Sequence, residues 1–155
     1  MKLDRPLRIV VVAGLLPAAA AAFVGASPSP PQAEGQAAVR SVWSGVYTDA
    51  QARRGHGAYL NDCARCHGEN LMGGDDASPL AGEAFLSNWD GRTMADLFDR
   101  IRRSMPDDDP GSLPNEQVAD VLAYLLNENG FPPGSRELAH EIAPLKQIRI
   151  DAKQP

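Results

Sequence analysis

The sequence predicts an all-α fold, and three observations indicate it. Thr48 followed three residues later by Gln51 is typical of a capping box at a helix N-terminus. Two later segments repeat apolar residues at helical spacing. These residues are Met94, Leu97, Phe98, Ile101 and Met105 in the first stripe, and Val118, Val121, Leu122, Leu125 and Leu126 in the second. No run alternates with period 2 for long enough to indicate a sheet.

The first two helices and the segment between them have predicted limits. The first helix begins after Thr48 and runs up to Cys63, and residues 68–82 then form a glycine-rich loop with no periodicity. Thr93 can cap the second helix, whose apolar stripe ends at Pro106. Proline lacks the backbone N–H and clashes with the preceding turn, so this helix stops there.

The third helix is preceded by a loop and followed by a tail. Residues 107–114 are acidic and punctuated by proline, which indicates a loop. Asn115 opens the third helix, and Gly130 with the prolines after it ends the helix. The tail, residues 132–155, is sparsely apolar and is assigned to no domain. The sequence therefore predicts one helical domain over residues 47–131.

The first 26 residues resemble a secretory signal peptide. Three basic residues among the first eight are followed by a run of 18 uncharged residues that ends at Ala26, with small residues at the cleavage position. Cleavage of residues 1–26 would place the mature chain in the periplasm, beginning with a flexible, proline-containing linker at residues 27–46. The alternative is an uncleaved membrane anchor, because a run of 18 residues is at the lower limit for a spanning helix.

The charge balance limits the possible partners. The full sequence carries 15 basic and 20 acidic side chains, and loss of the signal leaves 12 and 19, a net charge of −7. This balance excludes nucleic acid as a partner, because nucleic acid requires a basic surface. Asp107, Asp108 and Asp109 form an acidic run, which is either a solvated turn or a patch that steers a basic partner.

Cys63-Ala64-Arg65-Cys66-His67 is the motif that carries chemistry. Cys63 and Cys66 lie on one face of a helical turn, so both sulfurs can bond to the vinyl groups along one porphyrin edge. His67 is then carried beneath the ring, where its imidazole can ligate the iron. The motif thus predicts one covalently attached haem c. A disulfide, a redox pair or a zinc site would use the same cysteines, but the adjoining His67 favours haem.

The sixth iron position has several candidate ligands. They are Met72, Met94, Met105, His56 and His140. Met94 begins an apolar stripe, which is typical of core filling, and Met72 follows His67 too closely to reach the opposite face of the ring. Met105 lies at a helix end, 38 residues after His67, and is the predicted ligand. The alternative is an open sixth position, which would suit a haem enzyme or a ligand sensor.

Together these motifs resemble class I bacterial cytochromes c, small all-α domains built around one haem. The resemblance covers about Tyr47 to Phe131. It implies that Met105 lies on the distal methionine loop and that the carbonyl of Pro79 holds the His67 ring through a hydrogen bond. It also implies that a small and an aromatic residue pack the first helix against the last. These residues are Gly55 and Tyr59, with Val121 and Tyr124 as their counterparts.

Two further residues are candidates for contact with a haem propionate. Trp89 and Arg92 have suitable side chains, but a packed indole and a solvated guanidinium explain them equally well. Apolar residues of the same region are expected to form low-dielectric walls, which would favour the less charged ferrous iron. These residues are Phe85, Trp89, Phe98 and Ile101.

The resemblance implies a protein that carries single electrons and transforms no substrate, because His67 and Met105 together leave no vacancy at the iron. Three segments are similar to those of cytochromes that accompany quinoprotein alcohol dehydrogenases. They are Val46-Tyr47-Thr48, Gly111-Ser112-Leu113 and Asn129-Gly130-Phe131. This similarity suggests redox protein partners, with a quinoprotein dehydrogenase as the electron donor. An alternative is an electron-transfer subunit docked to a dehydrogenase, with the tail after Phe131 as a clasp.

Overall fold

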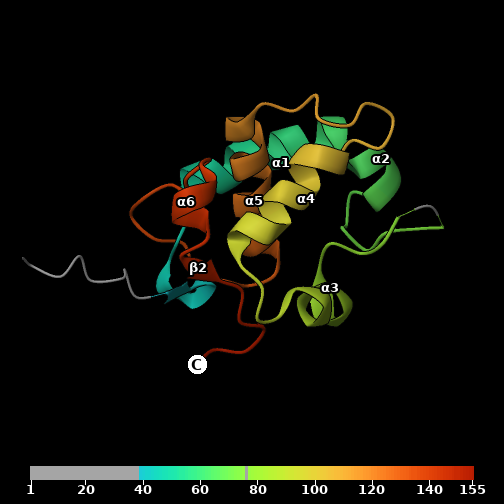
Figure 1. Cartoon of the computed structure of the whole chain (residues 1–155). Coiled ribbons are helices and arrows are strands. Elements are labelled where there is room, and N and C mark those ends of the chain that lie inside the picture. Colours follow the sequence, from blue (N-terminus) through green and yellow to red (C-terminus); the bar gives the residue numbers. More distant parts are fainter. Residues whose placement is uncertain (1–38, 76) are drawn as a thin grey trace, which may run out of the picture. The chain divides into compact units, whose positions relative to one another are not determined.

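Residues 39–75 and 77–155 are described by the computed structural model, and they belong to one compact, mainly helical unit (Figure 1). The elements in chain order are β1 (Arg40–Ser41), the 3-10 helix η1 (Val42–Ser44), α1 (Asp49–Asp62), α2 (Ala64–His67), α3 (Gly82–Trp89), α4 (Met94–Ser104), α5 (Asn115–Glu128), α6 (Ile142–Leu145) and β2 (Ile148–Arg149). The predicted signal peptide and residues 27–38 of the predicted linker lie outside the described residues. The rest of the predicted linker, residues 39–46, is folded onto the domain, with Val42 and Val46 buried, so the prediction of a flexible linker is wrong there. The all-α prediction is confirmed, since the strands are two residues each.

The predicted helix starts are found, with one difference in the first. The Thr48 hydroxyl accepts a hydrogen bond from the Gln51 backbone N–H at 3.1 Å, so Thr48 caps α1. Thr93 and Asp96 form a complete capping box at α4, with both reciprocal hydrogen bonds present. The Gln51 side chain does not close the box at α1. It reaches instead to the backbone of Leu138 in the tail.

The central helix pair consists of α1 and α5, which pack closely because α1 carries a glycine at the crossing. A Cβ at Gly55 would lie 1.8 Å from the carbonyl oxygen of Asp120 and 3.0 Å from the Cβ of Tyr124. The rings of Tyr59 and Tyr124 lie beside this crossing, with centroids 5.3 Å apart. The predicted contact between the two helices is therefore present, with the Asp120 backbone, and not Val121, as the nearest atoms to Gly55.

The two predicted apolar stripes face the core. In α4, Met94 and Phe98 are fully buried, and the later members Ile101 and Met105 are partly buried. All the predicted stripe residues of α5 are buried, and this helix contacts both α1 and α4. The short helix α3, whose Phe85 is buried, was not predicted, because the segment between the loop and Thr93 is too short for a helical period to emerge.

The tail packs on the domain, although its sequence indicated no structure. Its buried apolar residues are Leu138, Leu145, Ile148 and Ile150. Strand β2 pairs in parallel with β1, in the register Arg40 to Ile148. Ile150 also exchanges two backbone hydrogen bonds of 2.8 Å with the turn between α3 and α4, accepting from Gly91 and donating to Arg92. The compact unit thus extends through residue 155, beyond the predicted boundary at residue 131.

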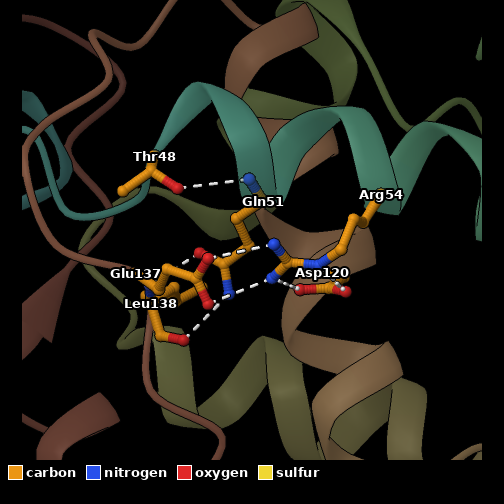
Figure 2. Close-up of polar contacts among 6 residues, drawn as sticks. All are labelled: Thr48, Gln51, Arg54, Asp120, Glu137 and Leu138. Atoms are coloured by element: carbon orange, nitrogen blue, oxygen red, sulfur yellow. Dashed lines mark hydrogen bonds and ion pairs between the residues drawn. The ribbon is translucent and has the colours of Figure 1, made fainter.

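A polar cluster fastens the tail to α1 and α5 (Figure 2). The Gln51 amide donates to the Leu138 carbonyl at 3.0 Å and accepts from the Leu138 N–H at 2.7 Å. The Arg54 guanidinium donates to both carboxylate oxygens of Asp120 and to both of Glu137, at 2.8 to 3.0 Å. One turn of α1 therefore contacts α5 and the tail together.

Among the described residues, no helix is long and apolar enough to span a membrane.

Candidate functional site

The Cys-x-x-Cys-His motif begins where α1 ends, and it forms the single turn α2. The Cys63 N–H donates to the Tyr59 carbonyl at 2.9 Å, and the His67 N–H donates to the Cys63 carbonyl at 3.0 Å. Both thiols are free, with Cys63 partly buried and Cys66 exposed. Burial raises the pKa of the Cys63 thiol to about 11, and Asp62 and Cys66 raise it further. The two sulfurs are therefore both free, and they lie on one helical turn.

Tyr59 fixes the C-terminal end of the motif from inside the core. Its side chain is fully buried, and its hydroxyl donates to the Gly68 carbonyl at 2.6 Å. Burial raises the pKa of Tyr59, so the hydroxyl keeps the proton that it donates. Gly68 has a φ of +76°, which lets the chain leave the motif in a direction that side-chain-bearing residues rarely adopt. The sequence predicts only a packing role for Tyr59, and its hydrogen bond to Gly68 is an additional one.

The loop after the motif returns to the His67 ring. The Nδ1 atom of His67 lies 2.8 Å from the backbone carbonyl oxygen of Ser78. A carbonyl oxygen only accepts, so Nδ1 carries the proton and Nε2 keeps a lone pair for a ligand. The prediction assigned this carbonyl to Pro79, and the structure places it one residue earlier, at Ser78.

A close approach within the loop explains the position of this carbonyl. A Cβ at Gly73 would lie 2.3 Å from the Ala77 carbonyl oxygen and 2.8 Å from the carbonyl carbon of Ser78. The Gly73 N–H also donates to the His67 carbonyl at 2.9 Å. The loop is thus folded tightly onto the motif, and Ser78 is the residue that this fold brings to the imidazole. Neither contact can be read from the spacing of residues in the sequence.

These residues fit a haem c. Attachment needs two free thiols on one turn, and iron ligation needs an imidazole with a fixed ring and a free nitrogen. The structure provides the thiols of Cys63 and Cys66, and the Ser78 carbonyl fixes the tautomer of His67. The alternative of a structural disulfide is not realised, since both cysteines of the sequence are free.

The candidates for the opposite side of the iron are placed in different environments. Met94 is buried in the core, as predicted, and Met72 is 59% exposed. His56 is exposed on α1 with its ring against Tyr124, and His140 lies 3.3 Å from a carboxylate oxygen of Glu141. Met105 is the C-cap of α4 and is partly buried. Its role as a ligand stays a prediction.

The structure brings the motif and the segment after Met105 together. Arg65, between the two cysteines, forms an ion pair with Asp108 at 2.7 Å. Asp62, directly before Cys63, accepts a hydrogen bond from Gln117 at the start of α5. The sequence predicts either a solvated turn or a steering patch for residues 107–109 and no partner for Arg65, whereas the structure pairs one of these carboxylates, Asp108, with Arg65.

Trp89 and Arg92 lie next to each other at the turn between α3 and α4. The Arg92 guanidinium carbon is 5.7 Å from the centre of the Trp89 ring, within range of a cation–π contact. Both residues line an open depression of about 390 Å³ together with residues of α4. In the described part of the chain Arg92 forms no salt bridge. Their contact with a propionate stays a prediction, as does the role of the buried Phe85 and Phe98 as walls.

Comparison with known proteins gives one family match and one similar structure. Residues 50–125 match the family described as cytochrome C oxidase, cbb3-type, subunit III. No curated protein gives a significant match. The chain is similar to one solved structure, the sulfane dehydrogenase SoxCD from Paracoccus pantotrophus, at 23% identity and a TM-score of 0.48, over 81% of this chain and 68% of that chain. The family match spans α1, the motif, the loop after it, α3, α4 and most of α5.

Proposed function

We propose that the protein is a periplasmic single-electron carrier of the c-type cytochrome kind, because residues 50–125 match the family described as cytochrome C oxidase, cbb3-type, subunit III. In this proposal Cys63 and Cys66 attach one haem c, and His67 and Met105 ligate its iron. A bound haem c supplies a one-electron ferric/ferrous couple. The chain would bind no substrate at the iron, because both axial positions are filled by its own side chains. The observation that carries the proposal is the contact between His67 Nδ1 and the Ser78 carbonyl.

The roles of the residues follow from their surroundings. The Ser78 carbonyl holds the His67 ring, and Tyr59 holds the backbone of the next residue, Gly68, so the imidazole keeps one orientation and presents Nε2. Met105 follows the last turn of α4, where its backbone N–H still donates to Ile101 at 2.9 Å, so its Cα is set by the helix. A thioether in the sixth position raises the reduction potential relative to a second imidazole. With this higher potential, the protein is proposed to accept electrons from a donor of only moderate reducing power.

The location and the partners are part of the proposal. The signal-like segment of residues 1–26 supports export, and a mature net charge of −7 supports protein partners with basic surfaces. The donor is proposed to be a dehydrogenase, of the quinoprotein class that the sequence similarity suggests. The apolar residues of the tail are buried in their own domain, so a clasp formed by them onto a dehydrogenase is not favoured.

The decisive experiment compares two methionine variants of the haem-loaded protein. Met105→Ala is expected to abolish the thioether-to-iron charge-transfer band of the ferric protein and to allow rapid carbon monoxide binding to the ferrous protein. Met72→Ala is the matched control, because Met72 is 59% exposed in the loop after the motif and should change neither property. Rapid carbon monoxide binding by the unmutated protein would refute the carrier and favour a haem enzyme or sensor.

The stoichiometry and the location need separate measurements. The pyridine haemochrome spectrum of the denatured protein should report one haem of the c type per chain, and potentiometric titration should follow a one-electron curve. Fractionation of cells that produce the full sequence should recover the haem protein in the periplasm, with its N-terminus at or near residue 27. Recovery in the membrane fraction with residues 1–26 retained would replace the soluble carrier by an anchored one.

A further inference from the structure

The attachment motif is tied to the segment that follows Met105 by an ion pair. The Arg65 guanidinium Nη2 atom donates to the Asp108 carboxylate at 2.7 Å. Arg65 lies between Cys63 and Cys66, and Asp108 follows Met105 by three residues. The Arg65 hydrogen bond lowers the pKa of Asp108, which is consistent with attraction between the two charges. The contact thus joins the two segments that carry the proposed iron ligands.

A second contact joins the same two regions at the other end of the loop. The side-chain nitrogen of Gln117 donates to the carboxylate of Asp62 at 2.5 Å, and the bond is partly buried. Asp62 is the last residue of α1 and directly precedes Cys63. Gln117 is in the first turn of α5, immediately after the loop of residues 105–114. Residues on both sides of Cys63 therefore hold the two ends of this loop.

The loop has few other attachments. Its own backbone hydrogen bonds are local, from Asp109 to the Pro106 carbonyl at 3.2 Å and from Ser112 to the Asp109 carbonyl at 3.3 Å. Residues 107–112 are all exposed, and Leu113 is the residue by which the loop enters the core. The position of the loop relative to the motif is therefore set mainly by its side-chain contacts and by the ends of α4 and α5.

We propose that Arg65 and Asp62 are positioning residues that hold the loop after Met105 against the attachment motif and so keep the methionine thioether on the iron. This inference rests on the proposed ligation by Met105. The two contacts differ in character. Arg65 and Asp108 have side chains 71% and 60% exposed, so their attraction is small and is screened by salt. The hydrogen bond between Gln117 and Asp62 is partly buried and short-ranged, so salt should not weaken it.

The test measures how easily imidazole displaces the methionine from the ferric, haem-loaded protein. Asp108→Asn removes the ion pair, and Asp109→Asn removes the same charge from the neighbouring residue, which forms no salt bridge among the described residues. At about 10 mM salt, Asp108→Asn should bind imidazole about two- to fivefold more tightly than Asp109→Asn. At about 1 M salt, where charges are screened within about 3 Å, the two variants should agree. Equal affinities at low salt would overturn the role of the ion pair.

Two further variants separate pair formation from a general charge effect. Arg65→Gln should give the same shift as Asp108→Asn, and the double variant should add nothing to either single change. Gln117→Leu should tighten imidazole binding at low and high salt alike, because its bond to Asp62 is not screened. Additive shifts in the double variant, or an unchanged affinity in Gln117→Leu, would contradict the corresponding contact. Urea unfolding of each variant shows whether the shift occurs without a loss of global stability.

Met105→Ala distinguishes failure of this inference from failure of the proposed function. If it binds imidazole no more tightly than the unmutated protein, then Met105 is not the ligand and both proposals are wrong. If Met105→Ala binds much more tightly while Asp108→Asn matches Asp109→Asn, the carrier function stands and the positioning role of Arg65 is wrong. Faster hydrogen exchange at the Ser112 amide in Asp108→Asn would support loosening of the loop without reference to the iron.

Discussion

Replacing Gln51 by leucine is expected to destabilise the domain by about 2–4 kcal/mol, because this side chain is the buried polar link between α1 and the tail. Gln51 is 2% exposed, and it is the buried polar residue of the described core. Its amide satisfies both the N–H and the carbonyl of Leu138, as Figure 2 shows. Leucine fills a similar volume but offers neither a donor nor an acceptor.

The magnitude follows from what the substitution leaves behind. Leu138 is 3% exposed, so its two backbone groups are expected to lose their partners without gaining water. Each buried group without a partner costs about 1–3 kcal/mol, and the apolar surface of the new leucine offsets part of the sum. A loss of this size is a large share of the 5–15 kcal/mol by which a domain is typically stable.

The assay is urea unfolding of the haem-loaded protein, followed by far-ultraviolet circular dichroism and extrapolated to water. Gln147→Leu is the matched control, because Gln147 is an exposed residue of the same tail and its substitution should change stability by less than about 0.5 kcal/mol. Equal losses in the two variants, or a loss below about 1 kcal/mol in Gln51→Leu, would show that Leu138 is satisfied without Gln51 and would refute the reasoning.

The pH dependence of stability in a second variant, Gln51→Glu, tests the same contact. An ionised carboxylate can accept from the Leu138 N–H but cannot donate to the Leu138 carbonyl, and its burial raises its pKa. A protonated carboxyl group both donates and accepts, as the amide does. The variant should therefore be less stable than the unmutated protein at neutral pH and should recover relative to it as the pH falls. No relative recovery would contradict the geometry in Figure 2.

Two other predictions concern the same helix. Gly55→Ala should lower the free energy of unfolding by about 3 kcal/mol in urea, because its Cβ would lie 1.8 Å from the Asp120 carbonyl oxygen. Gly57→Ala is the control: a Cβ there would meet nothing within 4 Å, so the substitution should raise the free energy of unfolding by up to about 1 kcal/mol. Arg54 lowers the pKa of Glu137 below its usual value, so the pair stabilises the fold above the unfolded-state pKa and the effect is lost as pH falls through the lower, folded-state pKa. Glu137→Gln should thus lose less stability than the unmutated protein between neutral pH and about pH 3, and parallel losses would argue against the pair.

The parts of the structure that the sequence predicted are those with local signals. The motif, the caps at Thr48 and Thr93 and the apolar stripes each depend on residues within a few positions of one another, so spacing alone reveals them. The predicted acceptor for His67, the Pro79 carbonyl, was wrong by one residue, because the position of the Ser78 carbonyl depends on the close approach of the loop at Gly73. That approach is a property of the folded chain.

The tail was missed for a different physical reason. Its four buried apolar residues are spread over residues 138–150 and follow neither a helical nor a strand period. Their partners are distant in sequence, as with the pairing of Ile148 with Arg40 and the contact of Ile150 with Gly91 and Arg92. Segments that are held by such isolated long-range contacts leave no pattern in a local window. Gln51 gave a misleading signal, since its place in an apparent capping box concealed its contact with Leu138.

The tail and the two contacts of the motif lie near opposite ends of α1. Gln51 ties the tail to the first turn of α1. Asp62 connects the last turn of α1 to the first turn of α5, and Arg65 connects α2 to the loop between α4 and α5. The first link is buried and the ion pair of the second is exposed, so they differ in how readily solvent conditions weaken them. Loss of Gln51 should therefore lower global stability with little change in imidazole affinity, and loss of Asp108 should do the reverse. A variant at either position that moved both quantities together would show that the fold and the distal loop are one cooperative unit.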